Sequence, residues 1–269
     1  MPGSVRILGI GDIVGSPGRK IVLDQVGHLR KGKEIDFVVA NAENATGGAG
    51  IRPEHAKEML ENGVDVITMG DHVWGKREII PFISGCSRLL RPANYPDSNP
   101  GAGYVVVDAP FGTIAVIHVV GRIFMTTSQS ACPFTTAEAL ADRVREKTPV
   151  IVVDMHAEAT SEKVAFGWHM DGKASFIFGT HTHVQTADER ILPRGTAYIT
   201  DAGMTGPYES VIGRRVDRVL HKMITQMPAP FDVAEGDPRL CGAIATVDLE
   251  SGRATAVERV MLFEGGSIR

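Results

Sequence analysis

Short apolar runs alternate with amphipathic helical segments in the first part of the chain, and this alternation limits the fold more than any other feature. The segments 5–10, 35–40 and 64–69 are apolar enough to form strands, and each is followed by Gly, Asp or Asn. Helical spacing of apolar residues predicts a helix from about residue 17, and Pro53 suits the first turn of another. Strands joined through helices pair in parallel, so the sequence predicts a βαβαβ opening.

The rest of the chain follows a different pattern. Two runs joined by a short Pro-Phe-Gly turn, 104–108 and 113–120, predict an antiparallel hairpin. We also expect a helix over 136–147 and strands at 150–153 and 174–178, and three late strands that look antiparallel: 197–200, 243–249 and 254–263. Because no repeat or linker interrupts these elements, residues 1–269 are expected to form a single α/β domain with a mixed double sheet.

Composition and charge exclude several classes of function. The chain is 43% hydrophobic and 22% charged, and no apolar run approaches the roughly 18 residues of a membrane span, which argues against a membrane protein. A net charge of −4 argues against tight non-specific binding of nucleic acid. No secretory signal is visible, and the three cysteines (Cys86, Cys132 and Cys241) are far apart, so we expect a cytoplasmic protein.

Carboxylates and imidazoles follow the carboxyl ends of five expected strands, the edge at which open α/β sheets bind ligands. These residues are Asp12, Glu43, Asp71, His156 and the pair His181 and His183. Each has an ordinary explanation when it is taken alone: an Asp after a strand is often a helix cap, and a lone buried His is often a satisfied hydrogen-bonding group. Their common position at one edge favours a shared function.

The shared function that these residue types favour is metal binding. A His-x-His pair on an extended backbone points both rings to the same side. Two divalent ions would supply a charge of +4 against −3 from Asp12, Glu43 and Asp71. The mixed nitrogen and oxygen ligands suit Fe, Mn, Zn or Co better than Mg or Ca. The sequence therefore predicts a dinuclear site of the kind used in two-metal hydrolysis.

Several motifs resemble those of the YmdB-like family, a branch of the calcineurin-like metallophosphoesterases, in the same order and over nearly the whole chain. They are Gly11-Asp12-Ile13-Val14-Gly15, Asn41-Ala42-Glu43-Asn44, Gly70-Asp71-His72-Val73-Trp74, Arg91-Pro92-Ala93-Asn94-Tyr95-Pro96, Asp154-Met155-His156-Ala157-Glu158, Gly179-Thr180-His181-Thr182-His183-Val184 and Thr200-Asp201-Ala202-Gly203-Met204-Thr205-Gly206-Pro207. The resemblance implies two mixed sheets packed as a sandwich and flanked by helices. It also implies a phosphodiesterase for cyclic nucleotides, notably 2′,3′-cyclic ones.

The resemblance further implies a role for each residue of the site. Asp12, Glu43 and His183 would bind one metal, and the second would take Glu43, Asp71, His156 and His181, so that Glu43 bridges the two. The metals would be divalent or mixed-valence ions, with iron favoured and manganese as the alternative. His72 resembles the general acid of the family, and Asn44 is expected to bind the phosphate or to orient a neighbour. Self-association into a homo-oligomer is also implied.

The sequence departs from the family at two positions. The usual Gly-Asn-His is Gly-Asp-His here, so Asp71 adds a negative charge where the family has a neutral amide. This charge should hold the metals more tightly and raise the pKa of the attacking water. His118 replaces a more common Asn, and either a structural role or an approach to the site fits its position at a strand end.

The expected mechanism is attack of a metal-bridging hydroxide on phosphorus, with His72 protonating the leaving oxygen. The alternatives are a phosphomonoesterase that uses the same site, an amidohydrolase built on a barrel, and a metal-binding regulatory protein with little turnover. The late position of His-x-His and the lack of eight βα units weaken the barrel. Segments 91–100, 121–133 and 203–212 are expected to shape the substrate pocket.

Overall fold

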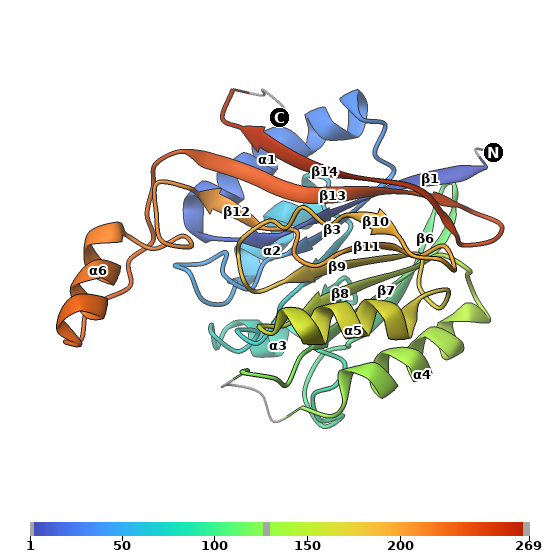
Figure 1. The fold of residues 1–269 in the computed structure, drawn as a ribbon, viewed down its shortest axis with the longest axis horizontal. Helices are drawn as coiled ribbons and strands as arrows, with labels where there is room; N and C mark the ends of the chain where they lie inside the picture. Colours follow the sequence, from blue (N-terminus) through green and yellow to red (C-terminus); the bar gives the residue numbers. More distant parts are fainter. Residues whose placement is uncertain (1–2, 126–129, 266–269) are drawn as a thin grey trace.

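Two β-sheets lie face to face in the computed structural model of the chain, which describes residues 3–125 and 130–265 (Figure 1). The first sheet has eight strands. They are β1 (Ser4–Ile10), β2 (Asp12–Ile13), β3 (Phe37–Asn41), β4 (Val66–Thr68), β5 (Leu89–Leu90), β12 (Met204–Pro207), β13 (Pro238–Asp248) and β14 (Ala254–Phe263). Their order is β2-β12-β13-β1-β3-β4-β5, with β14 paired to β13. The pairs β1–β3, β3–β4 and β4–β5 are parallel, which confirms the expected βαβαβ opening.

The second sheet has six strands, in the order β10-β11-β9-β8-β7-β6. They are β6 (Tyr104–Ala109), β7 (Gly112–Val120), β8 (Ile151–His156), β9 (Phe176–Thr180), β10 (Arg190–Ile191) and β11 (Ala197–Ile199). β6 and β7 form the expected antiparallel hairpin. The antiparallel prediction for 197–200 is wrong in one respect, because β11 pairs with β9 in parallel and is antiparallel only to the short β10. After β9 the chain forms β10 at the edge of the sheet and then turns back into β11, which lies between β10 and β9. β11 therefore runs in the same direction as β9.

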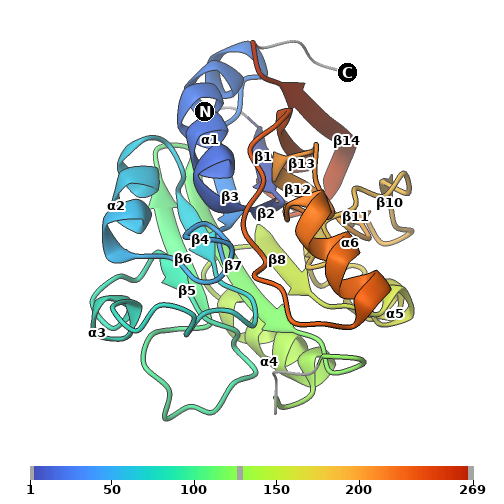
Figure 2. The same cartoon turned by 90° about the vertical axis from the view of Figure 1, so that its left-hand side faces the viewer.

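Helices cover the outer face of each sheet (Figures 1 and 2). Apolar residues of α1 (Gly15–Gly32), α2 (Pro53–Glu61) and α3 (Ile79–Ile83) pack on the first sheet. Those of α4 (Pro133–Arg145) and α5 (Thr160–Met170) pack on the second. The sixth helix, α6 (Val216–Thr225), stands away from both sheets in Figure 1. None of these helices in the described ranges is both long enough and apolar enough to cross a membrane.

Alternation along the strands explains how three apolar cores form around two sheets. In β1, Ile7 belongs to the core between the sheets, whereas its neighbour Leu8 belongs to the core under the helices of the first sheet. Successive side chains of a strand point to opposite faces, so an all-apolar strand buries both of them. Gly9 provides the close approach between the sheets, since a Cβ there would lie 2.8 Å from the Phe178 ring. The result is a helix–sheet–sheet–helix arrangement, with both sheets ending at a shared edge.

Candidate metal centre

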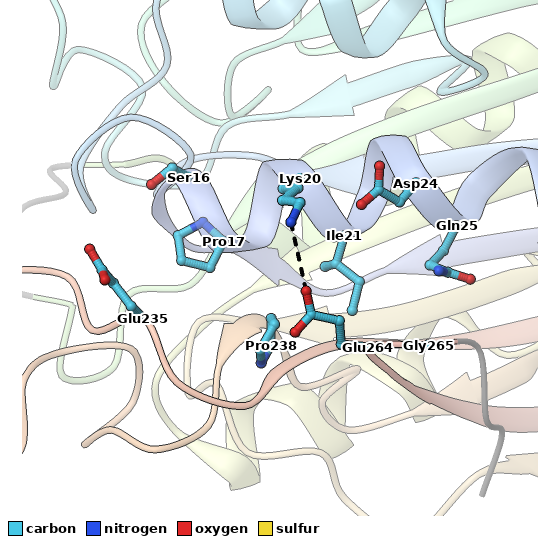
Figure 3. Close-up of a pocket in the computed structure, with 10 residues that line it drawn as sticks. All are labelled: Ser16, Pro17, Lys20, Ile21, Asp24, Gln25, Glu235, Pro238, Glu264 and Gly265. Atoms are coloured by element: carbon cyan, nitrogen blue, oxygen red, sulfur yellow. Dashed lines mark ion pairs between the residues drawn. The ribbon is translucent and has the colours of Figure 1, made fainter.

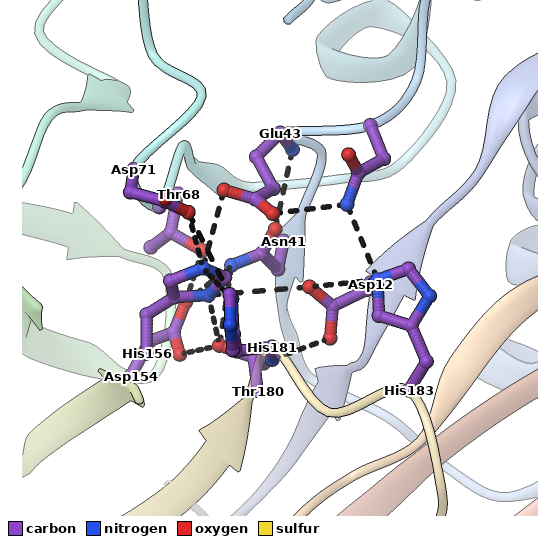
Figure 4. A network of polar contacts seen from close by, with 12 residues as sticks. Asp12, Asn41, Glu43, Thr68, Asp71, Asp154, His156, Thr180, His181 and His183 are labelled. Carbon is purple, nitrogen blue, oxygen red and sulfur yellow. Dashed lines mark hydrogen bonds and ion pairs between the residues drawn. The ribbon is translucent and has the colours of Figure 1, made fainter. Parts of the chain in front are cut away.

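The predicted site residues come together where the two sheets meet (Figure 4). Asp12, Glu43 and Asp71 follow β1, β3 and β4 of the first sheet, while His156 ends β8 and His181 follows β9 of the second. Glu43, Asp71, His156 and His181 each offer one ligand atom, and these atoms all lie within 4.8 Å of one another. His156 Nε2 is 3.2 Å from Glu43 Oε2, 3.2 Å from Asp71 Oδ1 and 3.0 Å from His181 Nδ1.

Hydrogen bonds orient the three imidazoles so that a lone pair of each faces this centre. Thr180 donates to Asp154 (2.7 Å) and so accepts from His156 Nδ1 (2.8 Å), which leaves Nε2 as the inward atom. His183 Nδ1 donates to the carbonyl of Ile212 at 3.0 Å. His181 Nε2 lies 3.2 Å from Glu158 Oε2, so its Nδ1 faces inward. Partners of this kind on the outer nitrogen are typical of metal-binding histidines.

Asp12 and His183 form the other side of the centre. Asp12 Oδ2 accepts from the backbone N–H of His181 at 2.9 Å, while Oδ1 has no hydrogen-bond partner although it is fully buried. His183 Nε2 lies 3.8 Å from that Oδ1. A buried carboxylate oxygen without a donor is costly, and a cation between the oxygen and the imidazole nitrogen would satisfy both.

The pKa shifts describe a site that requires positive charge. Burial would raise the pKa of Glu43, but His156 and His72 lower it well below its ordinary value. Burial would lower the pKa of His156, yet Glu43, Asp71 and Asp12 raise it well above the usual range. For Asp12, burial prevails over its histidine neighbours and raises the pKa to about 6. These carboxylates therefore stabilise a cation in their midst, either a proton on His156 or a metal ion.

Gly70 leaves the space that a metal would need. Its φ is +44°, and a Cβ at this position would lie 2.0 Å from Glu43 Oε2 and 2.6 Å from His156 Nε2. Only glycine therefore fits beside the ligand atoms. The residues therefore fit a metal centre. The space beside Gly70, the unpartnered buried oxygen of Asp12 and the inward lone pairs of the imidazoles all support this fit.

His72 and Asn44 lie beside the ligand atoms. His72 Nδ1 is 3.0 Å from Asn44 Oδ1, an acceptor, so Nδ1 carries a proton. Nε2 is therefore the ring nitrogen that can exchange a proton with a ligand. A hydrogen bond with Glu43, against partial burial, raises the pKa of His72. The Asn44 amide group donates to Glu43 Oε1 at 2.9 Å and lies 3.3 Å from His183 Nε2. Asn44 thus connects His72, Glu43 and His183.

The His-x-His argument assumed an extended backbone, but the loop that carries His181 and His183 is not extended. Their φ values are +97° and +65°, in the left-handed region that non-glycine residues rarely adopt. The two rings therefore join different parts of the centre. Asp201 Oδ2 holds the turn by accepting from Thr182 N (3.2 Å) and Thr182 Oγ1 (2.6 Å), and Lys163 Nζ, buried on α5, donates to the same oxygen at 2.6 Å.

A buried polar network behind His156 was not recognised in the sequence. Asp154 Oδ2 accepts from Thr68 Oγ1 (2.6 Å) and Asn41 Nδ2 (3.0 Å). His118 takes the structural alternative: it is fully buried, its Nε2 accepts from Gly70 N at 2.9 Å, and it does not belong to the ligand cluster. The quoted motifs contain Asn41, Asp154 and Glu158, and their alternation with the ligands along a strand was the available signal.

Several cavities of the described chain are of a size that suits a ligand, and two of them differ clearly in charge. One, of about 450 Å³, lies between α1 and the end of β14 (Figure 3). Its lining carries Asp24, Glu235 and Glu264 against Lys20, which pairs with Glu264 at 3.7 Å, so it repels anions. The other, of about 400 Å³, opens directly onto Glu43, His72, His181 and His183. Val211 and Ile212, of the expected segment 203–212, line it. Of the expected segment 121–133, residues 126–129 lie outside the described chain.

Paired mixed sheets with acids and histidines at their shared edge have the architecture expected of a calcineurin-like metallophosphoesterase, and the relatives below place the chain among these phosphoesterases. The fold is similar to that of a 5′-nucleotidase from Candida albicans SC5314 (TM-score 0.52, 11% identity, 96% of this chain and 51% of that chain).

The chain belongs to the YmdB-like family, since the family described as YmdB-like protein matches residues 8–260. It is 45% identical to the 2′,3′-cyclic-nucleotide 2′-phosphodiesterase of Bacillus subtilis (strain 168), over 96% of this chain and 97% of that protein. A crystal structure described as a novel phosphatase from Mycoplasma pneumoniae superimposes with a TM-score of 0.91 at 33% identity, covering 98% of this chain and 95% of the other.

Proposed function

We propose that this chain is a dinuclear-metal phosphodiesterase that hydrolyses 2′,3′-cyclic nucleotides. One observation carries the proposal: ligand atoms from both sheets converge, with inward lone pairs, on a space kept open by Gly70. The name of the B. subtilis relative supports the substrate class.

The proposed ligands are divided between two metals. Asp12, Glu43 and His183 would hold one, and Glu43, Asp71, His156 and His181 the other. Iron is the favoured metal and manganese the alternative, because imidazole and carboxylate ligands suit both. When bound, the metals supply positive charge to the phosphoryl oxygens and lower the pKa of the attacking water.

The protein's own groups would complete the reaction. A water oxygen forms the new bond to phosphorus and gives up a proton to solvent, while the P–O2′ bond breaks and the 2′ oxygen takes a proton from His72 Nε2. The product is a nucleoside 3′-monophosphate, and His72 regains its proton from solvent. Asn44 holds the other nitrogen of this imidazole through the 3.0 Å bond from His72 Nδ1. The hydrogen bond with Glu43 raises the pKa of His72, which favours its protonated, acidic form.

A second candidate function is cleavage of phosphate monoesters, favoured by the description of the M. pneumoniae structure as a phosphatase. The ligand set suits both reactions, because both require charge on the phosphoryl oxygens and an activated water.

The test is hydrolysis of 2′,3′-cyclic AMP by protein loaded with Fe²⁺ or Mn²⁺, beside metal-free protein and with adenosine monophosphates as competing substrates. Metal-dependent formation of adenosine 3′-monophosphate without further cleavage is expected. Release of inorganic phosphate from the monophosphates at a comparable rate would favour the phosphatase. No turnover with two metals bound per chain would leave the regulatory alternative and refute the enzymatic proposal.

A further inference from the structure

A helical arm stands beside the metal centre with most of its apolar surface uncovered. We define the α6 arm as residues 214–233; its two ends are joined by the hydrogen bond from Arg215 N to Asp232 O (3.0 Å). Apolar residues recur along one face of α6 and just beyond it: Val216, Val219, Leu220, Met223, Ile224 and Met227. Only Val219 of this face is buried. The stripe therefore does not serve the core of the chain.

Part of this apolar surface forms a wall of the cavity at the metal centre. The cavity of about 400 Å³ reaches from His72, His181 and His183 to side chains of the arm. Those side chains are Arg214, whose guanidinium donates to two backbone carbonyls, and the apolar Val219, Met223 and Phe231, with Val211 and Ile212 beside them. Met223 is 70% exposed and Phe231 is 42% exposed, so both present surface to a ligand. One end of the cavity is thus polar and suited to metal-bound phosphate, and the other is apolar. A pocket of this size takes a small organic molecule.

Two side chains, Arg214 and His183, hold the arm and the segment that leads into it beside the centre. The Arg214 guanidinium is half-buried and donates to the carbonyl of Phe231 (2.8 Å) and to that of Gly48, in the glycine turn that follows Glu43. On the other side, His183 donates to the carbonyl of Ile212. The apolar wall and the ligand atoms are therefore held at a defined separation, as a molecule with one anionic and one apolar end requires.

We propose that Met223 and Phe231 form the subsite that receives the nucleobase of the substrate while its phosphate lies at the metal centre. This inference rests on the proposed function. Thioether and phenyl groups bind flat aromatic surfaces well, and any of the bases can stack because each has a π-face. Lys222 Nζ lies 4.5 Å from the centre of the Phe231 ring and occupies one of its faces, so the base would use the other.

The chemistry of the wall also predicts its selectivity. Val219, Met223 and Phe231 have no side-chain hydrogen-bond donor or acceptor that could read a base edge, apart from the weak thioether. Selection would then follow the area of the ring, and purine nucleotides should bind more tightly than pyrimidine nucleotides.

Paired substrates separate this subsite from the catalytic centre. Glycerol 1,2-cyclic phosphate has the same five-membered cyclic diester as 2′,3′-cyclic AMP but no base. Replacing Met223 and Phe231 together by Ala should raise KM for 2′,3′-cyclic AMP about tenfold, as expected for the loss of base stacking. The kcat for both substrates and the KM for the glycerol ester should not change.

Ile224→Ala is the matched control, because Ile224 is on the same helix, is 78% exposed and does not line the cavity. It should leave both substrates unaffected. Equal KM increases for both substrates in the double variant would overturn the proposal. So would dissociation of an oligomer, measured by sedimentation velocity, together with equal loss of both activities, because the wall would then be a contact between subunits.

A binding measurement keeps the subsite distinct from the activity. If the wild-type protein hydrolyses neither diester, the proposed function fails, and calorimetry of the metal-loaded protein with adenosine 3′-monophosphate and with inorganic phosphate still tests the wall. Weaker nucleotide binding in the double variant, with phosphate binding unchanged, supports the subsite. Equal nucleotide binding by wild type and variant refutes it.

Discussion

At the scale of single residues, the proposed role of His72 as an acid, rather than as a metal ligand, can be tested by substitution. Its Nδ1 is held by Asn44, and it does not belong to the cluster of Glu43, Asp71, His156 and His181. His72→Ala should lower kcat for 2′,3′-cyclic AMP about 100-fold, the usual effect of losing a general acid. Metal content, measured by plasma mass spectrometry, should stay the same.

The leaving group provides the control for His72. A diester with a p-nitrophenolate leaving group needs little protonation, so the same variant should lose much less activity on that substrate. Loss of metal from the variant would contradict the role of acid and make His72 a ligand or a structural residue.

Asp71 affects the charge of the centre. Its Oδ1 is 3.2 Å from His156 Nε2, and Asn would keep the shape without the negative charge. Asp71→Asn should weaken metal retention and lower the pKa of the attacking water, so the basic rise of activity moves to lower pH. Titration with a chelator and the pH–rate profile measure both effects. Asp24→Asn, the same change on α1 away from the centre, should alter neither. An unchanged profile in Asp71→Asn would contradict the argument.

At the scale of elements, α5 holds the loop after β9 through one buried ion pair. Lys163→Met leaves the Asp201 carboxylate without its cation, although Thr182 still donates to it. Breaking a buried pair lowers the free energy of unfolding by about 3 kcal/mol or more, and the loop with His181 and His183 should bind metal less tightly. Urea denaturation and metal titration measure these effects.

Lys173→Met is the matched control, since Lys173 pairs with Glu138 at the partly exposed surface. An exposed pair contributes about 0–1 kcal/mol. Equal losses of stability in the two variants would show that the buried pair has no special role.

Asp188 connects the same loop to β11. Burial would raise the pKa of this carboxyl, but hydrogen bonds from Thr186 and Thr200 lower it below its ordinary 3.8. A group with a lowered folded-state pKa stabilises the protein above the unfolded pKa, and this stability is lost as the pH falls through the folded value. Asp188→Asn should therefore be less stable than wild type at neutral pH, and the difference should shrink below pH 3.8. Urea midpoints measured across this range test it; a constant difference would contradict the assignment.

The sequence predicted the elements whose pattern is set locally. The parallel opening, the hairpin of β6 and β7 and the strands β8 and β9 follow from apolar runs and turn residues, and so does the position of the polar residues at strand ends. The parallel pairing of β11 did not follow, because register and direction depend on how the chain crosses the sheet edge. The α6 arm was not predicted either, because its apolar stripe does not pack on a core.

In the site, too, local sequence patterns predicted which residues gather, but tertiary contacts decide how they are oriented. The residues Asp12, Glu43, Asp71, His156, His181 and His183 were expected at one edge because strand ends meet there. The orientation of each imidazole depends on Thr180, Glu158 and the carbonyl of Ile212, which are contacts that spacing does not reveal. The left-handed φ of His181 is a further example, since it results from tertiary hydrogen bonds to Asp12 and Asp201.

At the scale of the whole molecule, the proposed ligands join the two sheets: three carboxylates come from the first and three histidines from the second. Bound metal should stabilise the sandwich, because a ligand at 100 to 1,000 times its Kd adds about 3–4 kcal/mol. Removing metal with a chelator should lower Tm by about 5–15 °C for a chain of this size. Differential scanning calorimetry with and without Mn²⁺ measures the shift. A Tm that does not depend on metal would contradict a site shared by both sheets.

The pairing of β1 with β13 has a consequence for synthesis on the ribosome. β1 is made long before β13, which lies against it from Ser4↔Asp248 to Ile10↔Gly242. The amide of Gly11, next to Asp12, also donates to the carbonyl of Cys241 (3.0 Å). The first sheet can therefore close only after β13 has been made, and β1 lacks this partner in the meantime. Asp12 reaches its final position only then, so the proposed metal centre would be completed after the synthesis of β13.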